Sequence, residues 1–205
     1  SLVNVSAEER KKALVDYALP KNIKKMQADM EKYKIFYDKW FFESELHKSG
    51  AVKAVVDLLT KKGLTYEKDG AVWYKNKEVL TQKLLKEGKS QKYIDNLELK
   101  DDVLIRQNGN PTYFTADIAY HKNKFDRGFT TLIDVWGADH HGHVMRMKGA
   151  MDAIGYDGDK LNVVLMQLVK LVKDGELVRM SKRTGKAIQL GDLLDEVPVD
   201  SARFL

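Results

Sequence analysis

The sequence contains no cysteine, and this absence excludes a disulfide-stapled scaffold, a thiolate zinc site and a cysteine nucleophile. No apolar run approaches the ~18 residues that a membrane span needs, so no membrane partner is expected. The first ten residues, SLVNVSAEER, lack the apolar stretch of a secretory signal. Together these absences favour a cytoplasmic protein.

Proline is also scarce, with three among 205 residues, whereas apolar and charged residues are plentiful. A hydrophobic fraction of 43% is enough to form a core, and the length allows one domain or two small ones. The formal net charge of +5 permits a nucleic-acid partner without requiring one.

The first 110 residues combine helices with hairpins. Ser6 and Glu9 match the capping-box pattern S-x-x-E, which predicts a helix start. Pro20 is expected to end this helix, because proline has no amide hydrogen, and a second helix is predicted over 21–33. The lysines of that second helix form either a solvated face or an RNA-facing stripe.

Two more helices and two hairpins complete this region. Residues 49–62 are amphipathic, and residues 76–95 form a lysine-rich helical stretch. The two hairpins are predicted from the turn-forming dipeptides Asp69-Gly70 and Asn108-Gly109.

After residue 111 the pattern changes to strand–helix–strand. Residues 132–137 and 161–172 are apolar runs typical of buried parallel strands, and a helix that stops at Gly155 lies between them. The predicted fold is therefore α/β with a parallel sheet. Two or three strands are too few to complete a doubly wound sheet, so we expect the chain to be part of a larger domain.

The segment GADHHGH, from Gly137 to His143, follows the first of these strands. Ligands bind at the carboxyl ends of strands in open α/β sheets. Asp139 can accept hydrogen bonds, and the histidines can donate to phosphate. Three interpretations stay open for the segment: a metal-free polar ligand site, a metal site and a structural role.

Two other segments carry candidate chemistry. RMSKRTGK, from Arg179 to Lys186, suits a polyphosphate, although basic loops are often only solvated. In TYFTADIAYH, Tyr113 and Asp117 are four residues apart and share a helix face, where a carboxylate beside a tyrosine suits a cationic group. The alternative for this pair is a packed tyrosine and a capping aspartate.

Read in order, these three segments resemble the arginyl-tRNA synthetase family of the bacterial type. VRMSKRTG stands where class I synthetases carry the KMSKS loop, with Arg179 and Arg183 departing from its outer residues. The resemblance covers nearly the whole chain, and residues 76–100 match least. It implies the second half of a Rossmann-like nucleotide-binding sheet, preceded by a helix/hairpin insertion.

The resemblance also implies a division of the chain and a reaction. Residues 1–110 would hold flanking helices and the insertion, 111–190 the catalytic half-sheet, and 191–205 the start of a helical anticodon-binding domain. Arginine would be activated with ATP, accompanied by Mg²⁺, and then moved to the 3′ end of its tRNA. No dedicated metal site is implied.

Three groups of site residues follow from the resemblance. Arginine would be bound by Tyr113, Asp117 and His141. ATP would be bound by Gly137, Asp139, His140, Gln167 and Val169. The catalytic loop residues would be Met180, Ser181 and Lys182, with Lys182 stabilising charge on the leaving pyrophosphate.

One family signature is absent, because the sequence contains no H-[IVL]-G-H motif. We therefore expect an internal piece of a longer enzyme that does not catalyse alone, and that self-associates through an unpaired sheet edge. Two alternatives remain. Asp139-His140-His141 also occurs in two-metal phosphoesterases, although that interpretation leaves VRMSKRTG unexplained. A truncated, non-catalytic RNA-binding paralogue would use the basic helices.

Overall fold

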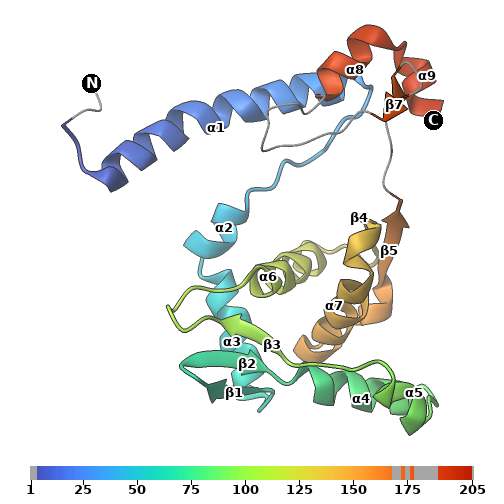
Figure 1. The fold of residues 1–205 in the computed structure, drawn as a ribbon. Coiled ribbons are helices and arrows are strands. Elements are labelled where there is room, and N and C mark those ends of the chain that lie inside the picture. Colours follow the sequence, from blue (N-terminus) through green and yellow to red (C-terminus); the bar gives the residue numbers. More distant parts are fainter. Residues whose placement is uncertain (1–3, 168–171, 174–175, 178–188, 205) are drawn as a thin grey trace. The chain divides into compact units, whose positions relative to one another are not determined.

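The computed structural model describes residues 4–167, 172–173, 176–177 and 189–204. The chain divides into two compact units (Figure 1). One unit is the continuous segment Phe41–Val169, and the other combines Ser1–Trp40 with Lys170–Leu205. None of the helices in the described ranges is long and apolar enough to cross a membrane. The three-part division given above stays a prediction.

The discontinuous unit is built around the long helix α1 (Ala7–Lys32). It also contains helices α8 (Leu190–Glu196) and α9 (Val199–Phe204), and the short antiparallel strands β6 (Val172–Lys173) and β7 (Glu176–Leu177). Lys32 forms an ion pair with Asp195, and the Tyr33 hydroxyl donates to the Ala202 carbonyl over 2.6 Å. The sequence ends of the described chain therefore meet in one unit.

Helix α1 begins as predicted but does not end where predicted. Ser6 and Glu9 form the complete capping box, with each side chain bonded to the other residue's backbone amide. The predicted break at Pro20 is wrong, because α1 continues through it to Lys32. No residue of α1 is buried, so water can satisfy the carbonyl that loses its partner, and the residues on both sides are good helix formers.

The continuous unit starts with helices α2 (Glu43–Lys48) and α3 (Ala51–Lys61) and a three-stranded antiparallel sheet. The sheet has the order β1-β2-β3, with strands β1 (Thr65–Lys68), β2 (Ala71–Tyr74) and β3 (Asp102–Ile105). The hairpin between β1 and β2 is confirmed, and its turn residues Asp69 and Gly70 both have positive φ. Helices α4 (Asn76–Lys86) and α5 (Gln91–Asp95) lie between β2 and β3 in the chain.

The second predicted hairpin is only partly correct. The chain does turn at Gly109, where φ is +79°, and Ile105 forms one antiparallel bridge with Pro111. No returning strand follows, because Thr112 caps a helix through a hydrogen bond from the Thr115 amide to its hydroxyl. Helix α6 (Tyr113–Asp126) starts there, and β3 pairs with β2 instead.

The parallel part of the fold is a strand–helix–strand unit. Strand β4 (Leu132–Gly137) leads through the 3-10 turn η1 (Ala138–His140) into helix α7 (His141–Ile154). Gly155 ends α7 with a left-handed φ of +101°, as predicted. The turn η2 (Gly158–Lys160) then leads into β5 (Leu161–Met166), which pairs in parallel with β4. The α/β expectation is confirmed.

Only one face of the β4–β5 pair is buried, which corrects the expectation of fully buried strands. Leu132 and Leu161 pack into a core with residues of α3, α6 and α7. The alternate residues Ile133, Val135 and Val164 are 45–69% exposed. Within the described ranges, the helices of the unit pack on the inner face alone.

Close packing of α4 against α7 yields a first prediction. A Cβ on Gly149 of α7 would approach Leu80 Cδ2 to 2.6 Å, and Leu80 is fully buried. Overpacking of this kind costs about 1–3 kcal/mol, which exceeds the ~1 kcal/mol gained from helix propensity. We expect Gly149→Ala to lower the free energy of unfolding, measured by urea denaturation.

Gly142 is the matched control on the same helix. A Cβ there meets no atom within 4 Å, so Gly142→Ala should leave stability unchanged or raise it by up to about 1 kcal/mol. Equal effects of the two substitutions would contradict the close packing of α4 and α7.

Candidate active site beside strand β4

A cavity of about 330 Å³ lies along β4 in the continuous unit. Helix α6, strand β4, turn η1 and the start of α7 contribute its walls. The lining residues are Asp117, Tyr120, His121, Lys124, Ile133, Asp134, Val135, Trp136, His140 and His143. Most of these side chains are polar or aromatic, so the cavity is suited to a charged ligand rather than an apolar one.

Helix periodicity explains the contribution of α6. Asp117, Tyr120, His121 and Lys124 follow the spacing i, i+3, i+4 and i+7, which places them on one helix face. Phe114 and Ile118, which lie beside this face on the same helix, enter the core. Thus one helix supplies both the hydrophobic packing and one wall of the cavity.

A buried carboxylate joins α6 to β4. Asp134 is 9% exposed, its Oδ2 lies 2.5 Å from His121 Nε2, and its Oδ1 accepts from Lys124 Nζ over 2.6 Å. Burial by itself would raise the pKa of Asp134, but the hydrogen bonds and charges of His121 and Lys124 outweigh it and hold the pKa below its ordinary value. Both oxygens of Asp134 are therefore occupied.

His121 also contacts the backbone of Asp117. Its Nδ1 lies 2.7 Å from the Asp117 carbonyl oxygen, and its ring packs edge-on against Trp136 with centroids 6.2 Å apart. The Asp117 carboxylate contacts His143 Nε2 through Oδ2, at 3.3 Å. Of the two carboxylates that line the cavity, Asp117 is thus the one with an oxygen that no residue in the described ranges contacts.

The structure brings some of the predicted site residues together. Asp117 and His140 both line the cavity. Gly137 ends β4 next to it, and a Cβ added to Gly137 would come within 2.7 Å of Asp139 Oδ1, closer than side-chain atoms normally approach. A larger residue at 137 would therefore displace Asp139.

The other predicted residues lie outside the cavity or outside the described ranges. Tyr113 is 79% exposed in the first turn of α6, and His141 is exposed at the start of α7. Gln167 is exposed and directly follows β5. The remaining four positions fall outside the described residues, and they are Val169, Met180, Ser181 and Lys182.

Sequence reasoning missed His121, Lys124, Asp134 and Trp136. A usable signal was present, because Asp134 interrupts the apolar run LIDVWG. A carboxylate in a buried strand needs partners, and a histidine and a lysine at suitable spacing on the preceding helix could have been identified as those partners.

No group of three or more histidine, aspartate or glutamate side chains in the described ranges is arranged to hold a metal ion.

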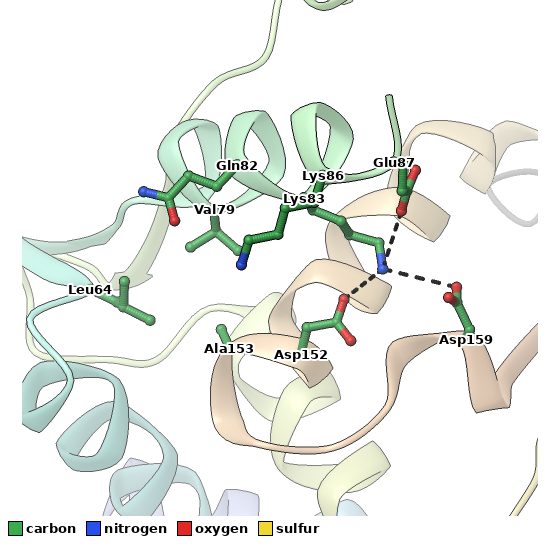
Figure 2. Close-up of a pocket in the computed structure, with 9 residues that line it drawn as sticks. All are labelled: Leu64, Val79, Gln82, Lys83, Lys86, Glu87, Asp152, Ala153 and Asp159. Carbon is green, nitrogen blue, oxygen red and sulfur yellow. Dashed lines mark hydrogen bonds and ion pairs between the residues drawn. The ribbon is translucent and has the colours of Figure 1, made fainter. Parts of the chain in front are cut away.

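A larger cavity of about 470 Å³ lies between α4 and the end of α7 (Figure 2). Lys83 points into it and contacts Asp152 at 2.8 Å, Glu87 at 3.5 Å and Asp159 at 3.9 Å. Partial burial lowers the pKa of Lys83, but the bond to Asp152 and the three negative charges raise it above its ordinary value. Because these charges already satisfy one another, the cavity beside β4 is the better candidate site.

Comparisons with known proteins decide the family. A family model described as tRNA synthetases class I (R), catalytic domain, matches residues 6–204. The chain belongs to the class I arginyl-tRNA synthetase family. The resemblance drawn from the sequence is confirmed, and the phosphoesterase interpretation is set aside because this match spans the segment on which it rested.

Curated relatives in this family are similar over nearly the whole chain. The arginine–tRNA ligase of Caldanaerobacter subterraneus subsp. tengcongensis is 55% identical over 202 residues, which are 98% of this chain and 33% of that protein. The corresponding enzyme of Ruminiclostridium cellulolyticum is 51% identical over 203 residues, again 98% and 33%. The chain therefore spans about a third of the length of these relatives.

Solved structures agree with this family. A Campylobacter jejuni protein assigned as an arginyl-tRNA synthetase is 34% identical, with a TM-score of 0.76 over 97% of this chain and 39% of that chain. The arginyl-tRNA synthetase of Thermus thermophilus is 19% identical, with a TM-score of 0.68 over 92% of this chain and 35% of its own. The second likeness supports the fold alone.

The buried cluster around Asp134 yields a second prediction. Removing one partner of a buried ion pair costs about 3–5 kcal/mol, so we expect Asp134→Asn to lower the free energy of unfolding by roughly that amount near neutral pH. Because the folded-state pKa of Asp134 is lowered, this stabilisation is fully present above the unfolded pKa of about 3.9 and is lost as the pH falls through the folded value. Chemical denaturation at several pH values measures both effects.

Asp57 provides the control, because it pairs with Lys53 on the exposed side of α3 at 2.5 Å. Its side chain is 60% exposed, so Asp57→Asn should cost no more than about 0.5 kcal/mol. A similar loss for both variants would show that the Asp134 cluster contributes nothing beyond a surface pair.

Proposed function

We propose that this chain is a catalytic-domain part of an arginine–tRNA ligase. Arginine would attack the α-phosphate of ATP, giving arginyl adenylate and pyrophosphate, and the arginyl group would then move to the 3′ end of its tRNA. The observation that carries this proposal is Asp117, whose carboxylate lies in a polar cavity beside β4 with one oxygen that no side chain of the described part of the chain contacts. The family assignment supports the same reaction.

Asp117 suits the guanidinium group of arginine. Charge-assisted hydrogen bonds between guanidinium and carboxylate are among the strongest in proteins. Asp134 is already neutralised by His121 and Lys124, so a cationic group entering this cavity would be directed to Asp117. Tyr113, one turn earlier on the same helix, and His141 are proposed as further arginine contacts.

The carboxyl ends of β4 and β5 suit the nucleotide. Gly137 pairs with Met166 in the parallel register, so Gln167 follows at the same end of the strand pair. Open parallel sheets bind ligands at this end, which supports the assignment of Gly137, Asp139, His140 and Gln167 to ATP. Val169 is proposed with them from the family pattern.

The remaining roles rest on the family pattern alone. Met180, Ser181 and Lys182 are proposed to close over the phosphates, with Lys182 stabilising the negative charge of the leaving pyrophosphate. Mg²⁺ would accompany ATP and neutralise phosphate charge. tRNA is the proposed macromolecular partner, and the cytoplasm the proposed location.

A chimera tests this proposal. The aligned third of the Caldanaerobacter ligase is replaced by this chain, and arginine-dependent ATP–pyrophosphate exchange is measured with tRNA present. We expect the chimera to be active. Asp117→Asn should raise the KM for arginine roughly 30-fold, because a hydrogen bond to a charged group contributes about 2 kcal/mol.

Asp126→Asn is the matched control, since Asp126 lies on the same helix but pairs with Lys122 at the surface. Its arginine KM should change less than about two-fold. An inactive chimera, or an Asp117→Asn chimera with an unchanged arginine KM, would refute the proposed function.

The 205-residue chain alone is predicted to be inactive. It spans a third of its relatives, and transition-state stabilisation requires all donors to be positioned together. No arginine-dependent exchange above background is expected with tRNA present, in the assay where the chimera is active. Exchange at a rate comparable to that of the chimera would show that the catalytic groups are complete in this chain.

A further inference from the structure

The His121–Asp134–Lys124 cluster has a geometry that packing alone does not explain. His121 is 3% exposed and Asp134 is 9% exposed, so both charges are largely withdrawn from water. Replacing a buried ionic cluster by apolar residues of similar volume is often neutral or stabilising. Stability alone therefore does not explain why a histidine and a carboxylate occupy these two positions. Their directional hydrogen bonds, in contrast, fix the position of α6 relative to β4.

Both ring nitrogens of His121 face acceptors. Nδ1 faces the Asp117 carbonyl oxygen at 2.7 Å, and Nε2 faces the Asp134 carboxylate at 2.5 Å. A carbonyl and a carboxylate can only accept, so both ring nitrogens carry a hydrogen when both bonds are formed. The imidazole is thus a rigid bridge between the backbone of Asp117 and the side chain of Asp134.

This bridge connects the two proposed subsites. Asp117 on α6 would hold arginine, and Gly137 at the end of β4 would adjoin the nucleotide. Asp134 lies three residues before Gly137 on the same strand, a separation of about 10 Å. Lys124 lies one turn after His121 on α6 and binds the second oxygen of Asp134. With two contacts to Asp134, the helix cannot rotate about the His121 hydrogen bond alone.

We propose that His121, clamped by Asp134 and Lys124, is the positioning residue that sets Asp117 relative to the nucleotide end of β4. The inference rests on the proposed function and deepens it. Arginine and ATP must meet in a near-attack geometry, and small displacements of a positioning group cause large losses of rate. His121 touches neither substrate in this scheme and acts through Asp117.

The test uses the chimera defined above, with arginine and ATP varied separately. Asp134→Asn and His121→Phe should each raise the arginine KM roughly ten-fold, because the Asp117 carboxylate is no longer held in place. The ATP KM should stay within about two-fold, which a general loss of structure would not produce. Asp126→Asn again serves as the control on α6.

A third variant and a second measurement guard against misfolding. Lys124→Met keeps the His121 bridge and should raise the arginine KM by a smaller factor, about three-fold. In the 205-residue chain, the ¹⁵N resonances of the His121 ring should shift in Asp134→Asn, because the ring loses its carboxylate partner, and should stay unchanged in Asp126→Asn.

The outcomes separate the two proposals. Three results would overturn the positioning role while leaving the proposed function intact: a parallel rise in the arginine and ATP KM values, unchanged KM values for Asp134→Asn and His121→Phe, or His121 ring resonances that do not respond to Asp134→Asn. An inactive wild-type chimera would overturn both. A selective rise in the arginine KM, together with His121 ring resonances that shift in Asp134→Asn, supports the role of His121.

Discussion

Burial of the Asp134 carboxylate is the constraint on which the rest of the site depends. A charge inside an apolar strand is unfavourable unless it is paired and hydrogen-bonded. The chain meets this requirement by bringing one face of α6 against β4, where His121 and Lys124 occupy both carboxylate oxygens. The same contact places Asp117 and the end of β4 around one cavity. The position of the cavity therefore follows from the need to neutralise one side chain.

Features of the fold that depend on local chemistry were predictable from the sequence. The Ser6–Glu9 capping box, the Asp69-Gly70 turn and the stop at Gly155 each depend on a few neighbouring residues, and all three are confirmed. The break at Pro20 was predicted wrongly, because proline's effect depends on whether water can reach the freed carbonyl. The returning strand after Gly109 was also wrong, since a helix cap at Thr112 competes with strand pairing.

The site residues also divide into those that a single segment identifies and those that only a contact in the folded chain identifies. Asp117 and His140 were found because their segments carry recognisable patterns, and the structure places both at the cavity. His121, Lys124 and Asp134 were missed because their importance arises from a contact between a helix and a strand, which no single segment displays. The assignments of Gln167, Val169, Met180, Ser181 and Lys182 come from family resemblance, and they stay predictions.

The saturation of Asp134 also has an evolutionary consequence. With both of its oxygens engaged, the electrostatic potential inside the cavity depends on the single carboxylate of Asp117. Changing that residue to a neutral one would remove the other negative charge of the cavity and leave Lys124 paired with Asp134. One codon therefore separates a cavity that attracts cations from one that does not, so a descendant of this domain could lose its preference for cationic ligands without rebuilding its core.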